Sequence, residues 1–181
     1  MAIATEQIQG TYKLDHVHSS ASFAVKHMVV STFRGRFENF DATLVDGKLI
    51  GTVDVSSIVV KDENLAAHLQ SPEFFDAERH PELRFAAQDI RLDGDGKVSV
   101  DGELTIKGVT KPVAVTGTVT EPMADPYGNE RIGLNLTAKI DRTDFGVDWN
   151  NPLPSGEPSL ANDVTILAEL QFVKPGGETS Q

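Results

Sequence analysis

Apolar and polar residues alternate with a period of two through most of this chain, and no other feature constrains its fold as strongly. In residues 97–106, valine, leucine, isoleucine and one glycine share one parity, and serine, aspartate, glutamate and threonine share the other. Neighbouring side chains of a strand point to opposite faces, so such alternation is typical of antiparallel strands with one apolar and one solvated face. It predicts strands at residues 20–28, 97–106, 113–119, 132–140 and 164–172.

Turn-forming pairs divide the rest of the chain into further strands. Less regular strands are expected at residues 10–14, 33–45, 49–60 and 83–92. Four pairs suit hairpin turns, whose central residues need positive φ: Asp46-Gly47, Asp93-Gly94, Asp95-Gly96 and Lys107-Gly108. Eight or nine strands with hairpin connections leave two architectures, a β-sandwich or a closed β-barrel.

Two features favour the barrel. Several strands span about ten residues, which suits tilted barrel strands. The apolar faces also carry bulky groups, with nine Phe against one Trp and two Tyr. An eight-stranded barrel of this kind can enclose one elongated apolar ligand.

Two segments depart from the strand pattern. Leu65 and Leu69 lie four residues apart among good helix formers, and Asp62 is placed to cap the first turn. Residues 62–70 are therefore predicted to form a short helix. Residues 144–162 lack any period and hold three prolines, which predicts a long loop in the C-terminal half.

Length and composition exclude several classes of protein. The 181 residues suit one domain. The absence of cysteine excludes a disulfide framework, a thiolate nucleophile and an iron–sulfur cluster. The formal net charge of −11 argues against a general nucleic-acid binder and against docking on an anionic membrane, although solubility alone also explains it. With no apolar run of roughly 20 residues and no secretory signal pattern in residues 1–10, the expected location is the cytoplasm.

The histidines give no catalytic or metal signature. No G-x-S-x-G elbow, P-loop or G-x-G-x-x-G stretch follows a predicted strand. His16 and His18 share one side of an extended chain, but no third ligand at a recognisable spacing completes a metal site, so none is expected. His27 continues the face of Phe23 and Val25. It is either an interior histidine bonded to the backbone or a polar group that touches a ligand's head.

Aromatic residues carry a stronger signal. Phe33 and Phe37 share parity, whereas Phe40 has the other, and Phe74-Phe75 follows the predicted helix. Such residues either pack a core or line a pocket, since ligand cavities are mostly apolar with few polar groups. Six basic residues near strand ends are either surface charges or partners of a phosphate or carbonyl at a barrel mouth: Lys26, Arg34, Arg36, Lys107, Lys111 and Arg142.

A set of motifs runs in order along residues 10–174, the most specific being GELTIKGVTKPV at 102–113. The others are DHVHS at 15–19, FAVKH at 23–27, GRF at 35–37 with Phe40, HLQS at 68–71, FFD at 74–76, Pro81 with Phe85, RTDFG at 142–146 and Asp163-Val164. Together they resemble the YceI-like family, whose members bind polyisoprenoids.

The resemblance implies an all-β fold: an eight-stranded antiparallel lipocalin-like β-barrel over residues 10–174, with the short helix beside it. Residues 1–9 are then an N-terminal extension and residues 175–181 a disordered tail. The implied pore holds a long isoprenoid chain, such as a polyprenyl phosphate or a quinone-type lipid, or a fatty-chain lipid. It needs no cofactor and no catalytic residue. Dimers are common in the family, so a homodimer is expected, and the negative charge slightly favours a neutral or weakly charged lipid head.

We expect the ligand to contact the following residues: Phe23, Val25, His27, Phe33, Phe37, Phe74, Phe75, Phe85, Leu104, Ile106, Leu134, Leu136, Phe145 and Trp149. Two other functions stay open. One is an enzyme on the same barrel, with His27 as acid or base towards a lipid or small hydrophobic substrate. The other is a stress-related interaction protein whose barrel is filled by its own side chains.

Overall fold

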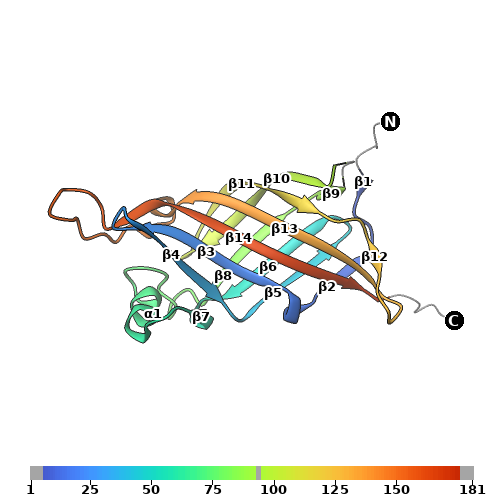
Figure 1. Ribbon diagram of the computed structural model, residues 1–181, viewed down its shortest axis with the longest axis horizontal. Helices are drawn as coiled ribbons and strands as arrows, with labels where there is room; N and C mark the ends of the chain where they lie inside the picture. The colour runs from blue at the N-terminus through green and yellow to red at the C-terminus, as the bar shows by residue number, and fades with distance from the viewer. Residues whose placement is uncertain (1–5, 93–94, 176–181) are drawn as a thin grey trace.

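The computed structural model describes residues 6–92 and 95–175. The strands close an eight-stranded antiparallel β-barrel, and helix α1 (Glu63–Gln70) lies beside one end of it (Figure 1). This confirms the predicted barrel. The strands are β1 (Glu6–Gln7), β2 (Thr11–Leu14), β3 (Ser20–His27), β4 (Ser31–Phe37), β5 (Phe40–Val45), β6 (Lys48–Asp54), β7 (Ile58–Val59), β8 (Glu82–Ala87), β9 (Arg91–Leu92), β10 (Lys97–Ile106), β11 (Val109–Val119), β12 (Met123–Ala124), β13 (Glu130–Asp141) and β14 (Leu160–Lys174).

The barrel has eight positions around its wall, which we call staves. Three staves consist of two strands each, namely β2 with β3, β4 with β5, and β6 with β7; the other five are β8, β10, β11, β13 and β14. Each stave pairs with its neighbours in sequence. The last stave, β14, pairs with β13 along one edge and with β3 and β2 along the other, which closes the barrel.

The paired strands correct the ranges predicted for the less regular segments. The predicted strand at residues 33–45 is interrupted at Glu38 and Asn39, and that at 49–60 is interrupted by a 3-10 turn at Val55–Ser57. Likewise, residues 83–92 form β8 and the separate β9. The interruptions shift the register between the first two staves by two residues. Thr11 pairs with Val45, and an uninterrupted antiparallel ladder continued from that pair would place Ala21 opposite residue 35. Ala21 instead pairs with Phe37.

The helix and hairpin turns follow their sequence signals. The Asp62 carboxylate accepts hydrogen bonds from the backbone N–H groups of Asn64 and Leu65, at 2.7 and 3.1 Å, so it caps α1 as predicted. Lys107 and Gly108 both have positive φ, as do Asp46 and Gly47. The predicted turn residues 93–94 lie outside the described residues. The loop at 146–159 follows a 3-10 turn at Arg142–Phe145, so the predicted loop is shorter by a few residues at each end.

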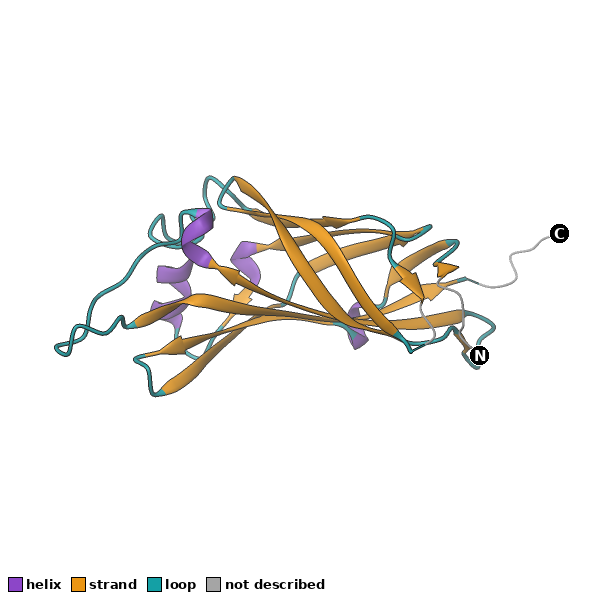
Figure 2. Cartoon of the chain, turned by 90° about the horizontal axis from the view of Figure 1, so that it is seen from above, coloured by secondary structure: helices purple, strands orange, loops and turns teal. Residues whose placement is uncertain are grey.

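Alternation places one face of each stave inside the barrel, where the apolar side chains form two clusters. One cluster fills the end near β12 and includes Tyr12, Leu134 and Phe172, each at most 1 % exposed. We call this the packed end. Ile8, in the segment predicted as an extension, is buried there too. The other cluster lies at the end near α1 and the 146–159 loop, which we call the open end (Figure 2).

A network of charged side chains joins distant parts of the chain beside the packed end. Arg131 donates from Nη1 to Asp15 Oδ2 and from Nε to Asp125 Oδ2, both at 2.7 Å. His18 Nδ1 lies 2.9 Å from the same oxygen of Asp15. The interaction with His18, and then that with Arg131, lowers the pKa of Asp15 to about 2. The hydrogen bond from Arg131 likewise lowers the pKa of Asp125 to about 2.

This network predicts how stability depends on acid. Both aspartates have a lower pKa in the folded chain than their ordinary value of 3.8. They therefore stabilise the fold above about pH 4, and that contribution is lost as the pH falls towards about 2. We expect the Tm of the wild type to drop across this window and the Arg131→Met variant to show a smaller drop.

Thermal unfolding at a series of pH values measures this effect. Lys139→Met is the matched control, because Lys139 pairs with Asp163 at 3.5 Å and both side chains are largely exposed. Exposed pairs of this kind contribute little, so the control should keep the wild-type profile. An acid profile of Arg131→Met identical to that of the wild type would contradict the network's role.

Candidate functional site

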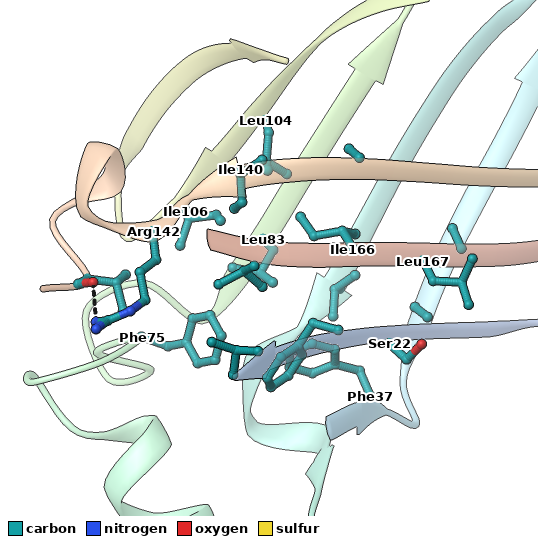
Figure 3. Close-up of a pocket in the computed structure, with 18 of the residues that line it drawn as sticks. Ser22, Phe37, Phe75, Leu83, Leu104, Ile106, Ile140, Arg142, Ile166 and Leu167 are labelled. Carbon is teal, nitrogen blue, oxygen red and sulfur yellow. Dashed lines mark hydrogen bonds between the residues drawn. The ribbon is translucent and has the colours of Figure 1, made fainter. Parts of the chain in front are cut away.

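The open half of the barrel encloses a cavity of about 630 Å³. Its walls are almost entirely apolar and come from strands on every side of the barrel. Helix α1, the Phe74-Phe75 segment and the 146–159 loop surround its mouth. Figure 3 shows Phe37, Leu104 and Ile166 on different strands around this space. A deep apolar space with few polar groups is the usual form of a small-molecule site.

Glycines on the inner wall explain why the barrel is hollow here. Gly35 lies against the ring of Phe23, and Gly102 lies against the ring of Phe85. A Cβ on Gly35 would lie 2.6 Å from the nearest carbon of the Phe23 ring, and a Cβ on Gly102 would lie 2.5 Å from the nearest carbon of the Phe85 ring. Without that Cβ, each ring lies against the barrel wall instead of projecting into the lumen. Gly51 also lines the cavity, and a Cβ there would meet only the backbone oxygen of Asp41, at 3.7 Å.

Two aromatic groups gather at the open end. Phe23, Phe37 and Phe75 have ring centroids 5.8 to 6.3 Å apart, and Phe33 lies 5.9 Å from Phe23. A second group joins Phe74, Trp149 and the ring of His68, with centroids 4.8 to 5.4 Å apart. Tilted and edge-to-face contacts at these distances are favourable for aromatic rings. The mouth therefore has a firm apolar border contributed by strands, helix and loop.

Arg142 is the one buried cation among the described residues, and it lies on the cavity wall. Its side chain is held by three backbone carbonyls: Nε donates to Ala161 at 2.8 Å, Nη1 to Val147 at 2.7 Å and Nη2 to Leu160 at 3.2 Å. Figure 3 draws a hydrogen bond of the Arg142 guanidinium as a dashed line. Burial lowers the pKa of the guanidinium from its ordinary value, against the opposing charges of Asp141 and Asp148. An arginine stays protonated at neutral pH even so.

Most of the predicted ligand residues come together around this cavity. Twelve line it: Phe23, Val25, His27, Phe33, Phe37, Phe74, Phe75, Phe85, Leu104, Ile106, Leu136 and Trp149. Leu134 and Phe145 do not. Leu134 shares the inner face with Leu136 but lies in the packed end, and Phe145 is buried in the cluster beside the cavity. Of the two interpretations of His27, the interior one is wrong, because His27 is exposed at the mouth.

Several cavity residues were not among the predicted ones. Val164, Ile166 and Ile140 line it from β14 and β13, and the alternation in those strands had already set them on the inner face. Leu65 and Leu69 of α1 also line it, and only the packing of the helix against the barrel brings them there. For Arg142 the sequence indicates only a cation near a strand end.

The part of the chain that the structure describes contains neither a metal-binding cluster nor a membrane-spanning helix. No three His, Asp or Glu side chains are grouped to hold a metal ion there. No helix in residues 6–92 and 95–175 is long and apolar enough to span a membrane.

Solved structures share this architecture. BcnA of Burkholderia cenocepacia is 25 % identical and superposes with a TM-score of 0.73 over 87 % of this chain and 98 % of its own. A YceI protein of Campylobacter jejuni is also 25 % identical, with a TM-score of 0.69 over 82 % and 89 % of the two chains. A polyisoprenoid binding domain from Saccharophagus degradans has a TM-score of 0.71 over 91 % and 98 %; at 13 % identity this likeness shows the fold alone.

Relatives by sequence lead to one family. A UPF0312 protein of Vibrio parahaemolyticus is 31 % identical over 160 residues, covering 81 % of this chain and 85 % of the relative. Another, from Staphylococcus aureus, is 31 % identical over 173 residues, covering 89 % and 96 %. The family model described as the YceI-like domain matches residues 12–172. Because that match spans most of the barrel, this chain belongs to the YceI-like family.

Proposed function

We propose that this protein binds a long-chain isoprenoid or a similar amphiphilic lipid in the barrel cavity and acts as a carrier or storage protein for it. The observation that carries the proposal is the apolar cavity of about 630 Å³. The side chains of the packed end close the barrel below it, and aromatic rings border its mouth. The polyisoprenoid binding domain from Saccharophagus degradans, which shares the fold, supports the same ligand class.

The physical reason is the cost of exposing a lipid chain to water. Each methylene moved from water to an apolar site gains roughly 0.8 kcal/mol. The binding free energy of a chain in the cavity therefore depends mainly on how many of its carbons are buried. The wall offers Leu, Ile, Val and Phe side chains and few polar groups, which gives little means of telling one apolar chain from another. We therefore expect isoprenoid and fatty chains of similar length to bind with similar affinity.

The cavity favours this proposal over a barrel filled by its own side chains. Catalysis by His27 has less support, because that hypothesis needs a second polar group facing His27 inside the cavity. Three polar side chains at the mouth have other partners: Ser31, which pairs with His27 across β3 and β4, donates to the His27 backbone oxygen at 3.5 Å, His68 Nε2 lies 2.7 Å from Glu73 Oε2, and Ser159 donates to the backbone oxygen of Asn151. The cytoplasmic location and the homodimer remain predictions.

Copurification tests the proposal. Protein produced in bacteria and purified without detergent is expected to carry about one long-chain lipid per chain in native mass spectrometry, released by organic extraction. As a matched control, the same host expressing an unrelated β-protein of similar size should yield no such adduct. Repeated recovery of lipid-free protein that also fails to take up added polyprenyl or fatty chains would overturn the proposal.

A further inference from the structure

Three apolar side chains project into solvent from the turn between β3 and β4, at the open end of the barrel. Met28 is 44 % exposed, Val29 57 % and Val30 84 %. We call these three residues the tip. A cluster of exposed apolar side chains on a folded chain is typical of a surface that binds a protein or a membrane.

The backbone of the tip is strained in a way that two other hairpins of the barrel avoid. Met28 and Val29 have φ angles of 51° and 65°, in the left-handed region that bulky and β-branched residues rarely adopt. The hairpins at Asp46-Gly47 and Lys107-Gly108 also have two successive positive φ angles, and in each the second residue is glycine. In the tip the second residue is valine. An apolar side chain thus occupies a position where glycine would suit the backbone better, and such strain is typical of functional sites.

The tip lies at the mouth of the cavity, beside the 146–159 loop (Figure 1). Met28 lines the cavity, and its backbone N–H donates to the carbonyl oxygen of Ser159 at 2.7 Å. Residues 28–33 and 149–156 contain no Asp, Glu, Lys or Arg, although 24 % of the residues in the chain are charged. The open end therefore presents an uncharged and partly apolar surface around the entrance to an apolar cavity.

Two cations lie behind the tip on the outer face of the barrel. Lys26 of β3 and Arg34 of β4 are exposed. They point outward because their neighbours Val25 and Phe33 line the cavity and successive side chains of a strand alternate between faces. Their distance from the tip along the strands is on the order of 10 Å. Apolar side chains in front with cations behind them match the layers of a lipid surface, in which phosphate groups lie outside the acyl chains.

We propose that the tip inserts into the surface of a lipid bilayer, so that a lipid chain passes between the bilayer and the cavity without crossing water. The inference rests on the proposed function and adds a membrane as the partner from which the lipid is taken up. Apolar side chains gain free energy when they leave water for the acyl boundary. The net charge of −11 is repelled by an anionic surface, so a zwitterionic bilayer suits this chain best.

Two equally exposed valines give a matched test. Val30 is 84 % exposed at the tip, and Val17 is 85 % exposed in the 3-10 turn at His16–His18, beyond the other end of the eight-residue strand β3. Asparagine at either position leaves the net charge unchanged. Delipidated protein is floated with phosphatidylcholine vesicles. We expect Val30→Asn to lower the partition onto vesicles at least about threefold and Val17→Asn to keep the wild-type value.

Val29→Gly separates membrane binding from folding. Glycine adopts positive φ without strain, so this variant should unfold at the same temperature as the wild type or a higher one. It loses an apolar side chain of the tip, so its partition onto vesicles should also fall at least about threefold. A folded Val29→Gly protein that binds vesicles as the wild type does would contradict insertion of the tip.

The source of the lipid distinguishes this inference from the proposed function. Val30 does not line the cavity, so Val30→Asn should bind a fluorescent fatty chain added from solvent as the wild type does. Transfer of the same lipid from phosphatidylcholine vesicles should be at least about threefold slower for the variant. Equal transfer rates, or a wild type that does not bind vesicles, would overturn insertion of the tip and leave lipid binding intact. No uptake from either source by the wild type would instead overturn the proposed function.

The absence of cysteine from the chain allows a direct measurement of depth. Val30→Cys and Val17→Cys are each labelled with an environment-sensitive dye. When phosphatidylcholine vesicles are added, the emission from position 30 should shift to shorter wavelength and be quenched by spin-labelled lipid, whereas the emission from position 17 should not change. The same response at both positions, or a response at neither, would contradict the proposal. Self-association of the wild type without vesicle binding, abolished by Val30→Asn, would overturn it in favour of a contact between two copies of the chain.

Discussion

Gly51→Trp is expected to lower lipid retention by at least about tenfold without unfolding the protein. Gly51 faces the lumen between Leu49 and Val53, and a Cβ added there meets only ordinary contact, at 3.7 Å from Asp41. The indole therefore has room to enter the cavity and occupy the space of the lipid chain. The lipid-to-protein ratio after purification, measured by native mass spectrometry and extraction, reports the loss.

The matched control for this substitution is one residue away. Ile50 lies next to Gly51 on β6 but on the opposite face of the strand, outside the cavity lining. Ile50→Trp adds the same ring to the outer surface and should retain lipid as the wild type does. Full retention by a folded Gly51→Trp protein would show that the chain does not occupy the barrel.

Phe172→Ala and Phe75→Ala are expected to differ widely in their cost to stability, although both remove a phenylalanine ring. Phe172 is 0 % exposed in the packed end, so its removal leaves a void among side chains that cannot close it. We expect it to lower the free energy of unfolding by about 3–5 kcal/mol. Phe75 already borders the cavity and is half-buried. Its removal enlarges an existing space, and we expect a cost below about 2 kcal/mol.

Urea denaturation of the two variants measures this contrast, and lipid retention supplies the complementary result. Phe172→Ala should retain lipid at a temperature where it is folded, whereas Phe75→Ala should retain less because it alters the mouth. Equal losses of stability, or a larger loss for Phe75→Ala, would contradict the division of the barrel into a packed end and an open end.

The sequence predicted the regular strands well because alternation and turn chemistry act locally. Strand β10 begins and ends at the predicted residues, since its alternation runs into a Lys107-Gly108 turn in which both residues have positive φ. The break between β4 and β5 was missed, because each half alone has a strand pattern. The phenylalanines carry a signal of this break. Phe33 and Phe37 have odd numbers and Phe40 has an even one, and the inward-facing residues change from odd numbers in β4 to even numbers in β5.

The alternation predicts which side chains face the inside of the barrel, but it does not predict whether they lie in the packed end or at the cavity. Leu134 and Leu136 share one face of β13, yet one packs into the filled end and the other lines the cavity. That difference depends on the side chains that other staves contribute at the same level. Small inward residues at the cavity level, including Gly51 and Ala168, carry this information, but their level is known only once the register between staves is set.

Trp149 gives the most direct test of the central claim, that the apolar chain lies in the barrel with its head at the mouth. It is the single tryptophan of the chain, and it lines the mouth of the cavity. Delipidated wild-type protein is titrated with two long-chain lipids, one brominated next to the head and one brominated at the chain terminus. Bromine quenches indole fluorescence only at close range.

We predict saturable quenching at one lipid per chain, stronger for bromine near the head than for bromine at the terminus. The reason is that the terminus would lie deep in the barrel, away from Trp149. Equal quenching by the two lipids, stronger quenching from the terminus, or no saturable quenching would contradict the placement of the chain in the cavity.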